Sequence, residues 1–562
     1  MTYLAGPAAG RHASARRDGL VPKIFTMLRQ GYGLSDLRSD AVAGLTVAIV
    51  ALPLAMALAI ASGTTPERGL VTVVIAGFLI SALGGSRSQI GGPTGAFVVV
   101  VAGVIAHHGF DGLVLATLMA GVMLVVAGAV RLGNLMRYIP EPVVTGFTAG
   151  IAVIIFSSQV KDFFGLSIAH LPAAFLEQWQ ALISGFGTLS LATTGLSFAA
   201  LALILVLRRV APKVPGFLLV VILGALAVPL LHLPVATIGS RFGELQGAIP
   251  APSFPVITLA RLADLLPSAI TIAFLAGVES LLSAVVADGM TGGRHRPNAE
   301  LVAQGVANAA SALFGGLPAT GAIARTATNI RAGGRSPMSG ILHAVFVLAV
   351  MLVLAPLAVY IPLASLAAIL VVVAWNMSEV DKMRHLLSAP VGDRLLLLLT
   401  FGLTVAVDLT VAIAAGVVLA SILFMHRMAE SASIAPAFAP ESETEEDTRA
   451  HLPAGVEVFD VRGPLFFGAA ARLSEVLDQI GQPPRVFILR MEEVPLIDAT
   501  GVAAVQDFLR RCQSGDTKVI LSGLKPQAAE VLRRMGLAPQ PGKIAFTPDY
   551  DAALALAVAR VT

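Results

Sequence analysis

Two series of apolar segments run along most of the chain. Each segment approaches the roughly twenty residues that a helix needs to cross a bilayer, so each predicts a transmembrane span. The first seven lie near residues 41 to 62, 69 to 84, 94 to 106, 112 to 130, 141 to 158, 189 to 207 and 216 to 233. The second seven lie near 266 to 288, 299 to 314, 320 to 331, 338 to 358, 360 to 376, 394 to 407 and 409 to 425. The pattern predicts an all-α polytopic membrane domain of about 14 spans.

The third segment of each series is short, and a glycine-rich motif accompanies it. The motif reads GGPTGAF from Gly91 to Phe97 and GGLPATGAI from Gly315 to Ile323. Within hydrocarbon, a backbone leaves helical geometry only where protein or a polar cavity surrounds it. Each motif therefore predicts the start of a half-helix, with free N–H groups and a positive dipole end at the bilayer centre. The alternative is that these glycines and prolines only kink or pack helices.

Lysine and arginine are unevenly distributed between the predicted loops. If the amino terminus lies inside, the outer loops hold only Arg68, Lys161, Arg241 and Arg261. The inner loops hold Arg87, Arg131, Arg137, Arg208, Arg209, Lys213, Arg294, Arg296, Arg331, Arg335, Lys382, Arg384, Arg394 and Arg427. This asymmetry fits the positive-inside rule. Because seven is an odd number, the second series must run opposite to the first, which predicts an inverted repeat whose two half-helix starts face each other and form an anion site.

The overall composition agrees with an integral membrane protein. The 562 residues are 56% hydrophobic and only 13% charged, with a mean hydropathy of +0.82. The net charge of +3 and the lack of a basic stripe with interleaved aromatic residues exclude a nucleic-acid binder. The single cysteine, Cys512, has no partner for an intrachain disulfide, so we interpret it as a small buried apolar residue.

Changes of composition predict four parts of the chain. Residues 1 to 38 are basic and lack an apolar core of signal-peptide length, which indicates a cytoplasmic amino-terminal segment rather than a leader. Residues 39 to 427 form the transmembrane transport domain, and 428 to 452 form a linker that contains the acidic run ESETEEDT. From 453 to 562, strand-like and helical stretches alternate, which predicts a cytoplasmic α/β domain.

Two ionisable residues inside predicted spans are candidates for function, because charge at that depth is costly. Arg325 is the only lysine or arginine in the interior of a predicted span, since Arg331 and Arg394 stand at span ends, and it lies just within the second half-helix. Glu279 lies in the middle of the eighth span, with Ser283 one helical turn later. In an apolar setting a carboxyl group is protonated more easily, so Glu279 could carry a proton, or it could bind a sodium ion with Ser283. The alternative is a structural ion pair between Glu279 and Arg325.

Five segments follow one another along the chain, namely PLAMALAIASG, GGPTGAF, VESLLSAVVADGM, GGLPATGAIARTATNIRAGGRSP and IDATG. In this order they resemble the sulfate permease (SulP) family of anion transporters with carboxy-terminal STAS domains, and the resemblance extends from about residue 35 to the end. It implies a seven-plus-seven inverted repeat with a uracil-permease-like fold. A core domain of spans one to four and eight to eleven would then move past a gate domain of the other six spans. It also implies a homodimer in the plasma membrane.

The same resemblance implies which residues line the site. Matched by motif, the anion pocket consists of Leu54, Leu58, Thr94, Gly95, Ile323, Ala324 and Arg325. The acidic position that couples transport to a cation falls on Glu279, with Ser283 beside it. The chain has Leu54 where many animal relatives have glutamine, and Glu279 where sodium-coupled bicarbonate transporters of the family have aspartate. The longer carboxylate favours proton coupling.

The STAS segment also departs from its soluble relatives, which are phosphorylated on a serine directly after an aspartate. Here Ala499 follows Asp498, and the first hydroxyl belongs to Thr500. Phosphorylation at the usual position is therefore not expected, and Asp498 is interpreted as the cap of a helix beginning near Gly501. Asp498 and Thr500 remain the candidate regulatory residues, and the STAS domain has a cytoplasmic protein as its candidate partner.

The leading hypothesis is a secondary active anion transporter that takes up sulfate or a dicarboxylate with a proton by alternating access. A sodium-coupled bicarbonate transporter, an anion exchanger and an anion channel of the same architecture are alternatives, and so is a membrane sensor that signals through its STAS domain. The sequence shows no nucleophile–base pair, metal-ligand cluster or phosphate-binding lysine motif, so we expect neither an enzyme nor a cofactor.

Overall fold

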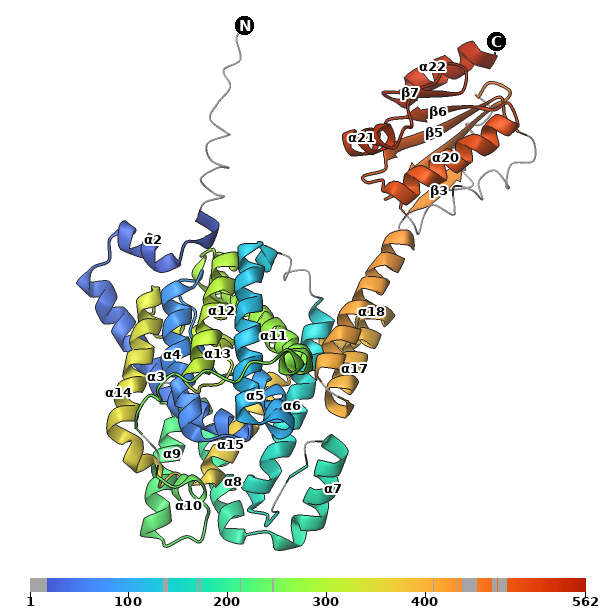
Figure 1. Ribbon diagram of the computed structural model, residues 1–562. Coiled ribbons are helices and arrows are strands. Elements are labelled where there is room, and N and C mark those ends of the chain that lie inside the picture. The colour runs from blue at the N-terminus through green and yellow to red at the C-terminus, as the bar shows by residue number, and fades with distance from the viewer. Residues whose placement is uncertain are drawn as a thin grey trace. The chain divides into compact units, whose positions relative to one another are not determined.

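The computed structural model of the protein describes residues 18–134, 140–168, 171–172, 174–212, 214–244, 247–407, 409–430, 432–436, 452–466, 473 and 483–561. The chain divides into two compact units, Met1–Val417 and Val418–Thr562. Figure 1 shows that the first unit is built of helices and that the second contains a sheet.

The first unit contains most of the long helices. In chain order its α-helices are α2 (Lys23–Gln30), α3 (Leu34–Ala61), α4 (Pro66–Leu83), α5 (Ala96–Ala129), α6 (Glu141–Phe164), α7 (Phe175–Gly185), α8 (Leu191–Val210), α9 (Gly216–Leu230), α10 (Ile238–Phe242), α11 (Leu259–Thr291), α12 (Pro297–Leu313), α13 (Ile323–Arg331), α14 (Pro337–Ala358), α15 (Leu363–Met377), α16 (Val380–Leu387) and α17 (Val391–Ala406). Helix α18 (Leu409–Glu430) follows, and short 3-10 turns cover Asp18–Leu20, Leu132–Asn134 and Phe186–Thr188.

Each of the expected spans coincides with a helix. The third and fourth spans are the two parts of α5, which is kinked at Gly109, where φ is 70° and ψ is −179°. Among the described residues, 9 helical segments are long and apolar enough to cross a membrane, and α5 is one of them. The remaining expected spans are the shorter helices α9, α12, α13 and α17. The sequence did not predict α2, α7, α10 and α16, because these short helices lack a long apolar run.

Helices of the first series pack against counterparts from the second series. Helix α12 packs on α5 and α4, α11 packs on α5, and α14 packs on α3 and α4 (Figure 1). In a second group, α15 and α17 pack on α6, while α8 contacts α15 and α9. Gly121 and Gly305 allow α5 and α12 to approach closely, since a Cβ on either one would lie within 2.7 Å of the other's carbonyl oxygen. The two groups correspond to the core and gate that the family resemblance implies.

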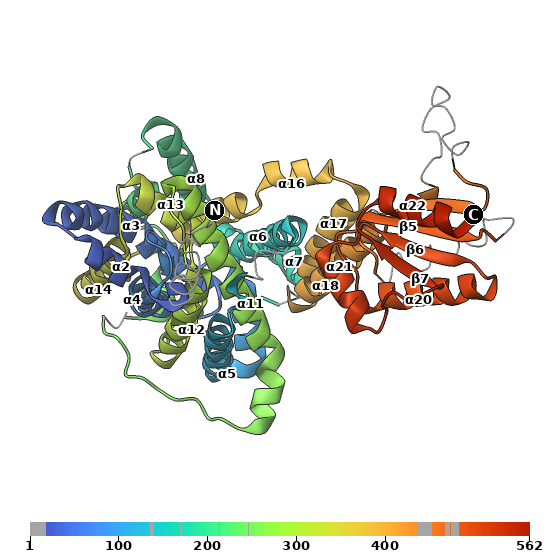
Figure 2. The ribbon, with the colours of Figure 1, turned by 90° about the horizontal axis from the view of Figure 1, so that it is seen from above.

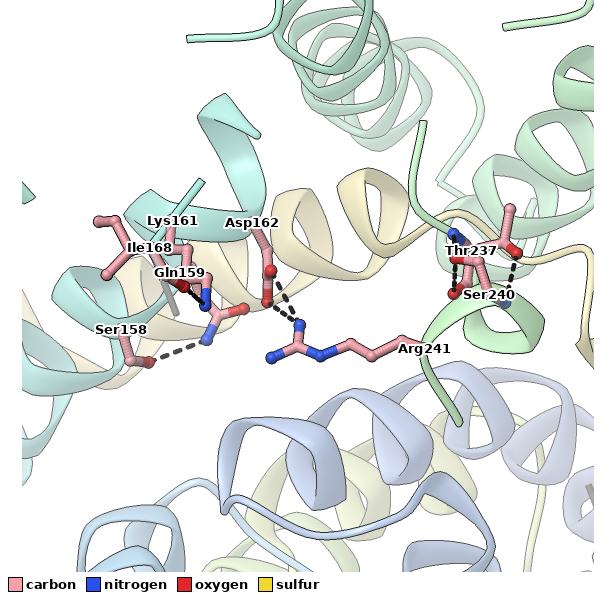
Figure 3. Close-up of polar contacts among 8 residues, drawn as sticks. All are labelled: Ser158, Gln159, Lys161, Asp162, Ile168, Thr237, Ser240 and Arg241. Atoms are coloured by element: carbon pink, nitrogen blue, oxygen red, sulfur yellow. Dashed lines mark hydrogen bonds and ion pairs between the residues drawn. The ribbon is translucent and has the colours of Figure 1, made fainter. Parts of the chain in front are cut away.

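A polar cluster joins the end of α6 to the short helix α10 (Figure 3). Arg241 Nη1 lies 3.0 and 3.1 Å from the two carboxylate oxygens of Asp162. Thr237 and Ser240 cap the start of α10 reciprocally, with N–H to hydroxyl distances of 2.9 and 3.2 Å. The ion pair is partly exposed, so it contributes only about 0–1 kcal/mol to the stability of this end of the unit.

The second unit contains a five-stranded sheet with the order β3-β4-β5-β6-β7. Strand β3 (Ser433–Pro436) is antiparallel to β4 (Val456–Arg462), and β5 (Val486–Glu493), β6 (Lys518–Ser522) and β7 (Ile544–Thr547) continue in parallel. Helices α20 (Ala499–Ser514) and α21 (Pro526–Arg534) cover one face, and α22 (Tyr550–Val561) covers the other (Figure 2). Alternate residues of β5 point to the two faces, as a sheet buried on both sides requires. This is the expected α/β domain.

The described elements do not follow the predicted part boundaries closely. Helix α3 starts at Leu34, inside the segment assigned to the amino terminus, and α18 runs on to Glu430. Ser433–Pro436, within the predicted linker, form the edge strand β3. Strand pairing uses backbone groups that a small-residue, proline-containing sequence does not reveal. Most of the predicted linker, 437 to 451, and residues 1 to 17 lie outside the described residues.

Candidate anion-binding site

The two glycine-rich motifs meet inside the first unit. Strand β1 (Gly91–Gly92) pairs antiparallel with β2 (Thr320–Gly321), with Gly91 opposite Gly321 and Gly92 opposite Thr320. All four residues are buried. The short ribbon allows two non-helical backbone segments to satisfy each other's polar groups within the membrane domain.

Two glycines of this ribbon leave no room for a side chain. Gly92 has a φ of +153°, and a Cβ there would lie 2.3 Å from Nη1 of Arg325. A Cβ on Gly321 would lie 1.6 Å from Nε2 of Gln89. Both contacts are much shorter than van der Waals separation. The motif glycines are therefore required for the two segments to approach each other, beyond any general use of glycine in helix packing.

A helix begins directly after each strand of the ribbon. Helix α5 starts at Ala96 and α13 at Ile323. In the described part of the chain, no hydrogen bond uses the backbone N–H of Ala96, Ile323, Ala324 or Arg325. Ile323 is 42% exposed and Ala324 is exposed, so the first turn of α13 reaches an accessible surface. Unpaired N–H groups at neighbouring helix starts suit the binding of an anion.

Arg325 turns inward beneath the ribbon. Only 3% of the residue is exposed, and Nη2 donates a hydrogen bond of 2.9 Å to the carbonyl oxygen of Pro93. Nε and Nη1 are buried and have no hydrogen-bond partner in the described structure. No ion pair joins Arg325 to an acidic residue among the described residues, so the expected alternative of a structural pair with Glu279 is not found. The positive charge of Arg325 is therefore available to an anion at the candidate site.

Glu279 contacts the first half-helix instead. Thr94 Oγ1 donates a 3.0 Å hydrogen bond to Glu279 Oε2, which ties the entry of α5 to the middle of α11. Ser283, one turn later on α11, is buried and lies 3.1 Å from Oγ1 of Thr326 on α13. Glu279 and Ser283 therefore share a helix face but bind different partners. Together they connect α11 to both half-helices.

Two hydroxyl residues at this junction were missed by sequence reasoning. Ser280 Oγ lies 2.6 Å from Thr320 Oγ1 and accepts the N–H of Gly321 at 3.0 Å. Thr326 Oγ1 accepts the N–H of Ile90 at 3.1 Å. In the sequence, the sign of Ser280 is the segment VESLLS, whose two serines are Ser280 and Ser283. Only Ser283 lies one helical turn after Glu279, so the sequence reasoning selected Ser283 alone. These hydroxyls hold the ribbon against α11 and α13.

The contacts of Gly95, and the positions of Leu54 and Leu58, show that the ribbon lies between the two helix groups. Gly95 faces the second group, because a Cβ there would lie 2.5 Å from Sδ of Met377 on α15 and 3.2 Å from Cδ1 of Ile155 on α6. Leu54 is half-buried and Leu58 is buried on α3, a helix that packs against α13. A site at the boundary of two packed groups can change its access when one group moves against the other.

The candidate regulatory residues lie in the second unit. Asp498 caps α20, and its Oδ1 accepts the N–H of Gly501 at 2.8 Å. Thr500 is exposed in the first turn of the same helix. Cys512, on the buried face of α20, is 2% exposed, and burial raises the pKa of its thiol to about 12. The capping role of Asp498 and the apolar role of Cys512 are confirmed, while a regulatory role of Asp498 or Thr500 stays a prediction.

Comparison with known proteins identifies the fold around this site. Residues 37–400 match the sulfate permease family, and residues 448–551 match the STAS domain. The chain belongs to the sulfate permease family. It is 44% identical to the putative sulfate transporter YvdB of Bacillus subtilis, over 93% of this chain and 98% of that protein. It is 30% identical to the bicarbonate transporter BicA of Picosynechococcus, over 89% and 91% of the two chains.

Solved structures show the same architecture. SLC26A9 is similar in fold with a TM-score of 0.85 at 17% identity, covering 100% of this chain and 98% of that one. The transmembrane domain of a cyanobacterial BicA gives a TM-score of 0.62 at 32% identity, covering 69% and 98%. The protein is thus a polytopic membrane protein with a carboxy-terminal STAS domain, as the sequence motifs predicted.

Proposed function

We propose that this protein takes up sulfate or a dicarboxylate together with a proton, as a secondary active transporter working by alternating access. Membership of a family of anion transporters supports the general activity. The observation that carries the proposal is the β1–β2 ribbon. It brings two helix starts together next to Arg325, a buried cation without an acidic partner in the described structure.

The site favours a small anion with several oxygen atoms. The free N–H groups of Ala96, Ile323 and Ala324 can each donate to one oxygen, and the helix dipoles add positive potential. Arg325 adds a full charge from beneath. Sulfate and carboxylates each carry several oxygen atoms that can accept such hydrogen bonds, so they are the leading candidate substrates.

Glu279 is the proposed coupling residue. It is the acidic side chain that hydrogen-bonds to a half-helix entry, and its partner Thr94 belongs to the motif itself. A proton on this carboxyl group would cancel a negative charge beside the anion and so favour anion binding. Release of that proton on the other side would weaken binding there. This reciprocal effect is the linkage that symport needs.

Sodium-coupled bicarbonate transport is a second candidate, and the similarity to the bicarbonate transporter BicA favours bicarbonate as its substrate. Glu279, Ser283 and the nearby hydroxyls of Thr320 and Thr326 supply oxygen atoms of the kind that a sodium ion prefers. The same architecture would also serve an exchanger or a channel. We further propose a homodimer in the plasma membrane, as the family resemblance implies. The distribution of Lys and Arg between the loops favours cytoplasmic termini.

Uptake into liposomes tests the proposal. The purified protein is reconstituted, and radiolabelled sulfate, fumarate and bicarbonate are offered separately, with and without an inward proton gradient and with and without sodium. We expect the proton gradient to accelerate uptake of sulfate or fumarate in the absence of sodium. Uptake that depends on sodium and prefers bicarbonate would establish the second candidate, and the absence of substrate counterflow would indicate a channel.

A matched pair of variants tests the coupling residue. Glu279→Gln keeps an amide oxygen that can accept from Thr94 but cannot carry a proton, so gradient-driven uptake should fall to the rate without a gradient. Asp264→Asn makes the same change of charge on the same helix, at a side chain that is 66% exposed. It should leave uptake unchanged. If both variants respond to the gradient like the unmodified protein, Glu279 is not the coupling residue.

A further inference from the structure

An apolar cavity of about 480 Å³ lies between α3, α4, α9 and α14. Leu52, Met56 and Val221 form part of its buried wall. Leu226 and Leu354, on opposite sides, are 53% and 45% exposed, so the cavity opens sideways onto an apolar surface of the membrane domain. Its size is typical of a small-molecule site, although its lining is unsuited to an inorganic anion.

Two polar groups stand at one end of this cavity. Glu67, in the first turn of α4, has a buried Oε2 that accepts no hydrogen bond, and it forms no ion pair in the described structure. The neighbouring Arg68 points elsewhere, donating to the carbonyl oxygen of Gly315 at 3.1 Å and lying 3.3 Å from the ring centroid of Phe110. Tyr360, just after α14, is 51% exposed, and no described hydrogen bond uses its hydroxyl. A carboxylate left without a partner at the rim of an apolar cavity calls for a cationic ligand.

We propose that the cavity binds a phospholipid with a primary ammonium headgroup, such as phosphatidylethanolamine. An acyl chain would fill the apolar part, and the ammonium group would donate hydrogen bonds to Glu67 while the Tyr360 hydroxyl donates to the phosphate. A primary ammonium has three N–H donors. The trimethylammonium group of phosphatidylcholine has none, so the carboxylate should distinguish the two lipids.

The cavity joins the two helix groups of the membrane domain. Helices α3, α4 and α14 belong to the group that carries the ribbon, whereas α9 packs with α8 in the other group. A lipid held between them would slow the movement of one group past the other. This consequence for transport rests on the proposed function, whereas lipid binding itself does not.

Lipid retention provides the test. The full chain is reconstituted in vesicles with equal phosphatidylethanolamine and phosphatidylcholine, re-extracted in mild detergent, and the lipid that remains bound is quantified by mass spectrometry. Ala355→Trp places an indole in the cavity, and Val353→Trp places one on the same helix at a position that is 72% exposed and outside the cavity. We expect the unmodified protein and Val353→Trp to retain phosphatidylethanolamine in excess, and Ala355→Trp to retain less of both lipids.

A third variant separates headgroup from chain. Glu67→Gln should retain as much lipid in total but lose the excess of phosphatidylethanolamine. If Ala355→Trp fails to elute as a single species, Ala225→Phe fills the cavity from α9 and serves instead. Equal retention of the two lipids by the unmodified protein would overturn the proposal. Retention by the filled variant equal to that of Val353→Trp would also overturn it. Selective retention by a protein that transports no anion would contradict only the proposed function.

Discussion

Replacing Gly92 by alanine tests whether the ribbon must close for the anion site to exist. The new Cβ would lie 2.3 Å from Nη1 of Arg325, on a residue whose φ of +153° disfavours any side chain. Backbone strain of this kind costs about 1–3 kcal/mol, whereas the contact involves only the end of the flexible Arg325 side chain, which can shift. We therefore expect Gly92→Ala to lower the free energy of unfolding by about 1–3 kcal/mol. Because the guanidinium must move, anion uptake should also be lost.

Gly103→Ala is the matched control. Gly103 lies in α5 beyond its first turn and outside the ribbon, and a Cβ there would meet nothing within 4 Å. Replacing a helical glycine by alanine is favourable by about 0.5–1 kcal/mol, so this variant should be slightly stabilised and transport normally. Both variants are compared by denaturant titration in detergent micelles and by uptake into liposomes. If Gly92→Ala matched Gly103→Ala in both assays, the close contact between the ribbon and Arg325 would not be needed.

Three further changes test other parts of the structure. Thr94→Val removes a hydrogen bond to the Glu279 carboxylate that contributes about 1.5–3 kcal/mol, so proton-driven uptake should fall. Thr94→Ser keeps the hydroxyl group and should retain proton-driven uptake. Equal uptake by the two variants would exclude a role for this hydrogen bond. Asp498→Ala should destabilise the STAS unit by about 1 kcal/mol, because Gly501 loses its acceptor, and Asp498→Asn should restore most of this in thermal unfolding. With a thiol pKa of about 12, roughly one part in ten thousand of Cys512 is ionised at pH 8, and the fraction rises with pH. Iodoacetamide should therefore label Cys512 only after unfolding, as followed by mass spectrometry, and rapid labelling of the native protein would show that the thiol is accessible.

The positions of the membrane helices followed from the sequence because each depends on a local property. A run of apolar residues is enough to predict a span, and α3, α6 and α11 were each anticipated from such a run. The meeting of the two glycine motifs was also predictable, since it follows from the symmetry of an inverted repeat. The amphipathic helices α7 and α16 were not anticipated, because their apolar residues cover only one face.

The contacts within the site could not be read from spacing alone. Glu279 and Ser283 share a helix face, yet one binds Thr94 of the first repeat and the other binds Thr326 of the second. Which partner each one finds depends on how α11 rotates against the ribbon, a tertiary property that helical periodicity does not determine. The inward direction of Arg325 has the same origin, since the missing Cβ of Gly92 creates the space that its guanidinium occupies.

The most direct test of the anion site is protection of the first turn of α13 by substrate. Ala324 is exposed and the native Cys512 is buried, so an Ala324→Cys variant offers one accessible thiol for a charged methanethiosulfonate reagent. Gly187→Cys, at an exposed turn between α7 and α8, is the control. We expect the transported anion to slow labelling of Ala324→Cys in proportion to its occupancy and to leave labelling of Gly187→Cys unaffected. Labelling of Ala324→Cys that is unchanged at saturating concentrations of a transported anion would contradict an anion site at the half-helix starts.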